Sequence, residues 1–382
     1  MKNLKLFLFF IFSTLLFISC SGQQEQEKPL VVDVNANYPK KDLILQNLFD
    51  VEYVPLETTD EFITHGNVKS TSKNIVVTTN WGGNGDIFLF DRTTGKGLQK
   101  INHFGQSGEE YTSATEILVD EAQKELFVID YSAKRILVYD LAGNFKRSFK
   151  TVEDSYYTNT FNYDTKHLLC YKSQTGLTDE HSKHILISKQ DGSLFKEIPI
   201  PFGKLESPVF VQGEITVSPS FYLTVANQEN WALTETSADT IYNYLSDGTL
   251  HPIIERTPSI HEMDPQVFLY PTVMCADYYF MKTQKKEFDM ARRKGFPTTQ
   301  LVYDKQENAI YEYMLYNGDW EEQIISFNSQ PINQEVLTWQ SMEAPDLIEA
   351  NAAGKLKGKL KEITDKLDED SNPVIMLIKP KR

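Results

Sequence analysis

The stretch EILVDEAQKELFVIDYSAKRILVYDLAGNFKRSFK, from Glu116 to Lys150, decides the fold. It divides into four strand-like runs separated by turns: Glu116–Asp120, Leu126–Asp130, Arg135–Asp140 and Phe145–Phe149. The inner runs are continuously apolar, as in strands buried on both faces, and the last run alternates like a strand at an outer edge. Four antiparallel strands in about 35 residues make one blade of a β-propeller, so the stretch predicts an all-β fold.

The pattern recurs along the chain, as a propeller requires. An apolar run followed by a turn with Gly or Asn occurs at Ile87–Asp91 with Gly95, Arg135–Asp140 with Gly143, Ile185–Ser188 with Gly192, Thr240–Tyr244 with Gly248, and Leu301–Asp304 with Asn308. The turn residues are 48, 49, 56 and 60 positions apart, close to the period of blade repeats. These copies and the leftover ends predict a six-bladed β-propeller of four-stranded antiparallel blades. Unrelated hairpins with even spacing would give the same pattern.

The two ends of the chain predict how the ring closes. Leu356, Leu360, Ile363 and Leu367 share one face of an otherwise charged segment, which predicts an amphipathic helix over Lys355–Leu367. The runs Phe49–Leu56 and Val374–Ile378 are both strand-like. Pairing them in one blade would remove the open edge of the sheet, so we expect residues 30–382 to form one propeller closed by its terminal strands.

Composition excludes one class of partner. The formal net charge is −15, whereas binding to nucleic acid phosphates needs a basic face, so no nucleic acid partner is expected. Aromatic residues make up 12% of the chain, with 19 Tyr and 23 Phe, which is typical of packed sheets. No Pro/Gly/Ser-rich linker separates two halves.

The N-terminus reads as an export signal. Lys2 and Lys5 precede an apolar run over residues 6–18, about 13 residues, which is too short for a bilayer core that needs roughly 20. The run ends at Cys20, and the pattern resembles a bacterial lipoprotein signal, which implies a signal peptide over residues 1–19 and lipid on Cys20. Residues 20–29 would form a polar tether. The expected location is the cell envelope, lipid-anchored to the outer membrane on its periplasmic or surface face. A plain secretory signal or an uncleaved anchor are the alternatives.

Four further pieces carry a family resemblance: Tyr53–Thr59, Phe104–Tyr111, Ile129–Asp130 with Val138–Asp140, and Asn372–Val374. Together they resemble the six-bladed β-propeller lipoproteins of Bacteroidetes, NHL-like domains mostly of unassigned function. The resemblance covers nearly the whole mature chain and is strongest from Tyr53 to Lys150. It implies the fold and the location and supplies no catalytic residues. The family's Gly-Gln-Gly-Pro-Gly-Glu-Tyr loop is altered at Gly105–Tyr111, which lacks one Gly and the Pro.

The residues that could bind a metal or take part in catalysis have structural explanations at the level of sequence. Cys170 and Cys275 lie in apolar runs and are expected to be buried thiols, although a disulfide between them is open. His181 and His184 lie in a polar stretch that predicts a solvated loop, and Gly82–Asp86 predicts a hairpin turn. Asp91, Asp130, Asp140 and Asp304 recur at strand ends, where bonds to turn backbone explain them. No metal motif is visible, and we expect no cofactor.

The prediction for function is a non-enzymatic binding or scaffold protein with an unknown protein or small-molecule ligand. Propellers bind at the mouth of the channel, where loops from the blades converge. Candidate contacts are Trp81, His103, Phe104, Gln106, Glu109, Glu110, Tyr111 and Trp231. The alternative is a metal-dependent hydrolase or lyase, similar to the propeller lactonases, with calcium bound in the channel. Ligands assembled from distant blades would leave no local spacing motif.

Overall fold

A computed structural model of the chain describes residues 28–80, 82–174, 181–292 and 294–381. The predicted signal peptide, Cys20 and most of the predicted tether therefore lie outside the described residues, as does Trp81. Within the described ranges, no helix is both long and apolar enough to cross a membrane.

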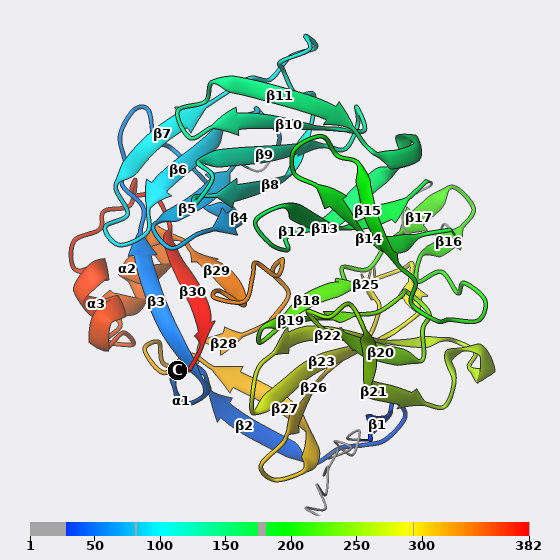
Figure 1. Cartoon of the computed structure of the whole chain (residues 1–382). Helices are drawn as coiled ribbons and strands as arrows, with labels where there is room; N and C mark the ends of the chain where they lie inside the picture. Colours follow the sequence, from blue (N-terminus) through cyan, green and yellow to red (C-terminus); the bar gives the residue numbers. More distant parts are fainter. Residues whose placement is uncertain (1–27, 81, 175–180, 293, 382) are drawn as a thin grey trace, which may run out of the picture.

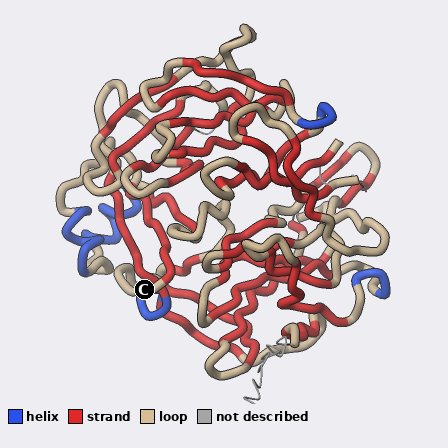
Figure 2. Tube along the Cα trace, viewed as in Figure 1, coloured by secondary structure: helices blue, strands red, loops and turns tan. Residues whose placement is uncertain are grey.

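The protein has an all-β, propeller-like fold in which antiparallel sheets surround a common centre (Figures 1 and 2). Three four-stranded sheets follow one another in the chain. The first contains β4 (Asn67–Thr71), β5 (Ile75–Thr79), β6 (Ile87–Asp91) and β7 (Gly97–Ile101). The second contains β8 (Ala114–Asp120), β9 (Glu125–Asp130), β10 (Arg135–Asp140) and β11 (Phe145–Lys150). The third contains β12 (Tyr156–Asn162), β13 (His167–Ser173), β14 (Lys183–Ser188) and β15 (Leu194–Ile198).

The second sheet shows why the sequence predicted these elements. β9 is buried along its whole length, because apolar side chains on both of its faces pack against neighbouring sheets. β11 alternates between half-buried and exposed positions, as expected of an outermost strand. β10 pairs with both β9 and β11 in antiparallel register. The predicted division of Glu116–Lys150 into four strands is confirmed.

The next part of the chain forms a wide sheet with two halves. The first half contains β18 (Thr224–Asn227), β19 (Asn230–Leu233), β20 (Thr240–Tyr244) and β21 (Leu250–Thr257). The second contains β22 (Val267–Met274), β23 (Tyr278–Lys285), β26 (Thr298–Asp304) and β27 (Ala309–Tyr316). One parallel residue pair, Asn227 with Met274, joins the halves. Short additions are β28 (Ile324–Ile325), which pairs with β27, and the hairpins β16 (Phe210–Gln212) with β17 (Ile215–Val217) and β24 (Phe288–Asp289) with β25 (Lys294–Gly295). Two 3-10 turns occur at η1 (Val152–Asp154) and η2 (Ile260–Glu262).

The N-terminal segment covers the outer edges of this wide sheet. β1 (Leu30–Asp33) pairs in parallel with β21, and β2 (Lys40–Ile44) pairs in parallel with β27. The short helix α1 (Leu45–Leu48) follows and leads into β3 (Phe49–Pro55). Because an outer strand otherwise presents unpaired N–H and C=O groups, β1 and β2 protect both edges from pairing with another chain.

A three-stranded sheet brings the two ends of the chain together. β30 (Val374–Pro380) lies between β29 (Thr338–Met342) and β3, antiparallel to both. All seven residues of β3 pair with β30, so the two terminal runs identified in the sequence are neighbours. Figure 1 shows β3 and β30 side by side, next to the sheet that contains β4.

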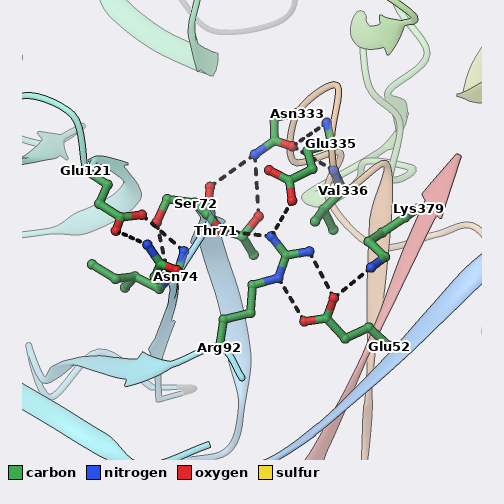
Figure 3. A network of polar contacts seen from close by, with 11 residues as sticks. Glu52, Thr71, Ser72, Asn74, Arg92, Glu121, Asn333, Glu335, Val336 and Lys379 are labelled. Carbon is green, nitrogen blue, oxygen red and sulfur yellow. Dashed lines mark hydrogen bonds and ion pairs between the residues drawn. The ribbon is translucent and has the colours of Figure 1, made fainter. Parts of the chain in front are cut away.

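Arg92 connects this terminal sheet to the first four-stranded sheet (Figure 3). Its guanidinium donates to Glu52 on β3 at 2.9 and 3.1 Å, to Glu335 at 2.9 Å and to the carbonyl oxygen of Ser72 at 2.8 Å. Lys379 of β30 also binds Glu52, at 2.9 Å. Only 4% of Arg92 is exposed, so this pair of carboxylates compensates a buried charge at the seam of the ring.

The predicted C-terminal helix is shorter than the sequence indicated. Helix α3 spans Gly358–Thr364, and α2 (Ala344–Ala352), which was not predicted, precedes it. Gly354 and Gly358 have φ of +71° and +59°, conformations that interrupt an α-helix, so Lys355–Lys357 are not helical. Leu360 and Ile363 are nevertheless buried, as the apolar stripe predicted, and Leu356 forms a bridge with Trp320.

The region around His184 corrects a second prediction. His184 lies in β14, is fully buried and belongs to no solvated loop. Four successive residues of β14, His184–Ile187, are buried, and His184 lies between Tyr171 of the adjacent strand β13 and Glu235 in the segment after β19. Cys170 and Cys275 are both buried and free.

Candidate functional site

The innermost strand of several sheets carries a β-bulge in its middle. The register shifts between Val68 and Ser70 in β4, between Ala114 and Glu116 in β8, between Thr158 and Phe161 in β12, and between Pro271 and Val273 in β22. The extra residues are all polar: Lys69, Thr115, Asn159 with Thr160, and Thr272. A bulge re-aims side chains next to it, so these strands present polar groups where regular strands would continue the apolar pattern.

Asn159 is the most constrained of the bulge residues. Its φ is +50°, in the left-handed region that Asn tolerates better than most residues. In this conformation the N–H groups of Asn159 and Thr160 both point at the Glu116 carboxylate, at 2.8 and 2.9 Å. The side-chain oxygen of Asn159 accepts from the N–H of Leu223 at 3.1 Å. One residue therefore connects β8, β12 and the segment before β18.

Lys69 extends this chain of contacts to β4. Its ammonium donates to the carbonyl oxygen of Thr115 at 3.0 Å. Burial lowers the pKa of Lys69, and the charge of Glu116 partly offsets that shift. Burial also raises the pKa of Glu116, opposed by the Thr160 and Asn159 N–H groups and by Lys69. One desolvated cation and one desolvated carboxyl group thus lie on adjacent inner strands.

A cavity of about 340 Å³ opens beside Glu116. Its lining combines four aromatic residues with six polar ones: Thr115, Glu116, Tyr131, Tyr156, Thr158, Asn159, Phe161, Ser173, Tyr222 and Gln330. Tyr131 and Tyr156 stack with ring centroids 4.5 Å apart, and Lys134 lies 4.5 Å above the Tyr156 ring. Burial raises the pKa of Tyr222, whose phenol donates to the carbonyl oxygen of Asn328 at 3.3 Å. A concave aromatic lining with a few convergent polar groups is typical of small-molecule sites.

A second cavity, of about 310 Å³, adjoins the first at Thr115. Its lining includes one cation, Lys69, one carboxylate, Asp86, and the amides of Asn67, Asn80 and Asn84, and the glycine-containing turn Gly82–Asp86 forms one wall. Phe104 lines the rim and is 54% exposed. We call the two cavities together the channel-mouth site; the first is its tyrosine compartment and the second its lysine compartment.

The structure separates the candidate contacts that the sequence singled out. Tyr111 and Trp231 are core residues, 0% and 2% exposed. His103 stacks on Tyr139 and its Nε2 lies 2.8 Å from the carbonyl oxygen of Gly143. These three side chains therefore take part in packing within the protein. Trp231 lies apart from the loop of the others and packs against Phe161, at the base of the tyrosine compartment.

The remaining candidates lie in the loop between β7 and β8. Gln106 and Glu109 are exposed, and the Glu110 carboxylate accepts from the Ser107 N–H at 2.9 Å, so it stabilises the loop. Hydrogen bonds to Ser107 and Gln106 lower the pKa of Glu110. Phe104 is the loop residue that reaches the channel-mouth site. Trp81 falls outside the described residues. Ligand binding by this group stays a prediction.

Sequence reasoning missed Lys69, Glu116, Asn159 and Tyr222. The signal that could have found Lys69 and Asn159 is a polar residue in the middle of a short strand-like run, the mark of a bulge when the neighbouring runs are apolar. Glu116 was included as the start of a strand, with no indication of its partners in β12.

The acidic side chains at the strand ends bind turn backbone. Among the described residues, no group of three or more His, Cys, Asp and Glu residues could hold a metal ion. Asp91 accepts from the N–H and hydroxyl of Thr94, and Asp140 accepts from the N–H groups of Ala142 and Asn144. The predicted role of these aspartates in turns is confirmed.

Comparison with protein families identifies the chain. The model of a domain of unknown function, DUF4934, matches residues 29–379. This protein belongs to the DUF4934 family. No curated protein matches it in sequence.

One solved structure with a TM-score above 0.5 supports the fold of this DUF4934 protein. A Bacteroides fragilis protein, provisionally described as exported, is 14% identical over 93% of this chain and 99% of that one, with a TM-score of 0.59. A DUF4221 family member from Bacteroides vulgatus is 11% identical over 88% of this chain and 98% of that one, with a TM-score of 0.48. Virginiamycin B lyase from Staphylococcus aureus is 10% identical over 74% of this chain and 97% of that one, with a TM-score of 0.37. At these identities the likeness concerns the fold alone.

Proposed function

We propose that this protein is a lipid-anchored, six-bladed propeller of the cell envelope that binds a small ligand at the channel-mouth site without transforming it. The observation that carries the binding function is the tyrosine compartment. Three tyrosines, Glu116 and Asn159 converge there on a space of about 340 Å³, within the usual range for small-molecule pockets.

A division of the wide sheet into two halves supports the count of six blades. Three four-stranded sheets and the terminal three-stranded sheet account for four blades. A single parallel residue pair, Asn227 with Met274, joins the two halves of the wide sheet. Within each half, neighbouring strands are paired continuously. Counting each half as a blade gives six, with β1 and β2 as additions at the outer edges.

The anchored location rests on the N-terminal apolar run that ends at Cys20 and on the exported description of the Bacteroides fragilis neighbour. Stable anchoring needs more than one acyl chain, because one chain holds a protein only reversibly. Cys20→Ala should release the protein from membranes or leave it unprocessed. Labelling cells with a radioactive fatty acid is the test, and label retained by the variant would refute the anchor.

Binding can be tested with coumarin-3-carboxamide, a neutral, planar, fluorescent probe. We expect the purified protein to bind it with a change in fluorescence. Tyr156→Ala should weaken the affinity about tenfold, because it removes one face of the stacked pair Tyr131–Tyr156. Tyr316→Ala, an equal truncation on the outer strand β27, is the matched control and should bind as the wild type does. Equal affinities in the two variants would refute the site.

The same probe separates binding from catalysis. Coumarin is a lactone, and hydrolysis opens its ring with loss of the long-wavelength absorbance. We expect the absorbance to stay constant during hours of incubation with the protein, with calcium or with EDTA. Ring opening that depends on the protein and on calcium would favour the hydrolase over the binding protein.

A further inference from the structure

Lys69 has binding capacity that the fold leaves unused. Its ammonium carries three donors, and among the described residues its bond to the Thr115 carbonyl is the one hydrogen bond it makes. No carboxylate of the described residues lies within 4.0 Å of it. Burial lowers its pKa, so the positive charge costs free energy where it stands. An anion placed against Lys69 would relieve this cost.

The nearest acidic groups already have donors of their own. Asp86, which also lines the lysine compartment, is paired with Lys100 at 3.3 Å and accepts from the side-chain amides of Asn84 and Asn102 at 2.7 and 2.8 Å. Glu116 accepts the N–H groups of Asn159 and Thr160 on the far side of Thr115. Among the described residues neither carboxylate forms an ion pair with Lys69, and the charge of Glu116 offsets the lowering of the Lys69 pKa only in part.

The two compartments differ in what they can recognise. The lysine compartment offers a cation and two amides, Asn67 and Asn80, to a negatively charged group. The tyrosine compartment offers the rings of Tyr131, Tyr156 and Tyr222 to a flat apolar group. They meet at Thr115, so one molecule of moderate length can occupy both.

We propose that the ligand of the channel-mouth site is an acidic ring compound: Lys69 binds its single anionic group, and its ring lies against the tyrosines. This inference rests on the proposed function, because it names the chemistry of the ligand in the same site. It excludes two classes of ligand as preferred occupants, namely cations and neutral ring compounds of equal size.

Coumarin-3-carboxylate and coumarin-3-carboxamide test the charge, because they share size and ring and differ in one negative charge. Binding of each is measured by fluorescence titration at fixed salt. We expect the wild type to bind the carboxylate about tenfold more tightly than the carboxamide. Lys69→Met should abolish this preference, because the anionic group loses its cationic partner. Lys69→Arg should retain most of the preference, because the charge remains.

Lys73→Met is the matched control, since it changes the net charge by the same amount. Lys73 is exposed in the turn after β4 and lines a different cavity at the other end of that strand. This variant should keep the preference for the carboxylate.

The outcomes separate the two proposals. Equal affinity of the wild type for both probes, or equal effects of Lys69→Met and Lys73→Met, would overturn the acidic ligand while leaving the binding site in place. If neither probe binds, or if Tyr156→Ala has no effect on the carboxamide, the proposed function fails and the inference fails with it. If Lys69→Met does not fold, Lys69→Gln takes its place: it should lose the preference that Lys73→Met keeps, and equal preferences in these two variants would overturn the acidic ligand.

Discussion

Glu235 is a buried acid whose surroundings favour its neutral form. It is 2% exposed, and one carboxyl oxygen accepts from the Tyr171 hydroxyl at 2.7 Å. The other oxygen lies 3.8 Å from Nδ1 of His184, which is fully buried. Burial raises the pKa of Glu235 to about 8 and lowers that of His184 to about 3. The two groups are therefore both uncharged near neutral pH, and the contact is no ion pair.

The raised pKa of Glu235 predicts a loss of stability as pH rises from about 4.5 to about 8. A carboxyl group with a pKa of about 8 in the folded state and 4.5 as its ordinary value binds a proton that the unfolded chain releases. Its stabilising contribution is complete below about pH 4.5 and is lost as pH rises through about 8. Urea unfolding of the wild type should therefore give a free energy that falls by a few kcal/mol between pH 5 and pH 9.

Glu235→Gln should remove this part of the pH dependence, because an amide carries no proton to lose. Glu229→Gln, at an exposed position, serves as the control and should follow the wild type. A Glu235→Gln protein with the same alkaline loss as the wild type would contradict the assignment. His184 acts in the opposite range, since its lowered pKa removes stability as pH falls from 6.5 towards 3.

At the scale of elements, the turn between β6 and β7 fits against the terminal sheet. Gly95 has a φ of +75°, and its carbonyl oxygen accepts from the N–H of Glu57 at 2.9 Å. A Cβ atom added at Gly95 would lie 1.7 Å from the carbonyl oxygen of Pro55, at the end of β3. Glycine is required here by the approach of another strand's backbone, in addition to the turn itself.

Two substitutions separate these requirements. Gly83→Ala introduces the same left-handed strain, at a φ of +71°, where a Cβ would meet nothing within 4 Å. It should cost about 1 to 2 kcal/mol. Gly95→Ala should cost at least about 2 kcal/mol more, because the β3 backbone must move as well. Chemical unfolding of both variants provides the comparison, and equal losses would show that the contact with Pro55 is unimportant.

The elements that the sequence predicted share one property: their pattern is local. Strands such as β9 and β10 have apolar residues at nearly every position, and Asp140 with Gly143 marks the turn after β10. The bulges at Lys69 and Asn159 could not be predicted in this way, since they depend on what the next sheet presents. The conformation of Asn159 brings its N–H group to the Glu116 carboxylate, 43 residues away, so it depends on a residue in another strand. The site was missed because its residues are brought together by the bulges.

At the scale of the whole molecule, β30 occupies a position unlike that of any other terminal segment. It is the last strand of the described chain, and it is also the central strand of its sheet, between β29 and β3. Five of its residues are buried, and Val374, Met376 and Ile378 belong to the largest apolar cluster. By contrast, β1 contributes four residues at an outer edge and pairs on one side with β21.

Deleting residues 374–382 should therefore be far more damaging than deleting β1. Loss of β30 leaves β29 and β3 without their shared partner and removes Lys379 from Glu52, so the ring opens at the seam that Arg92 connects. We expect this truncated protein to be unfolded or to melt more than about 10 °C lower, whereas removal of residues 30–33 should shift the melting temperature by only a few degrees. Similar shifts in the two truncations would contradict non-covalent closure. A synthetic peptide of residues 372–382, added to the first truncation, should insert between β29 and β3 and restore cooperative melting, because both edges present the unpaired N–H and C=O groups that a strand can satisfy.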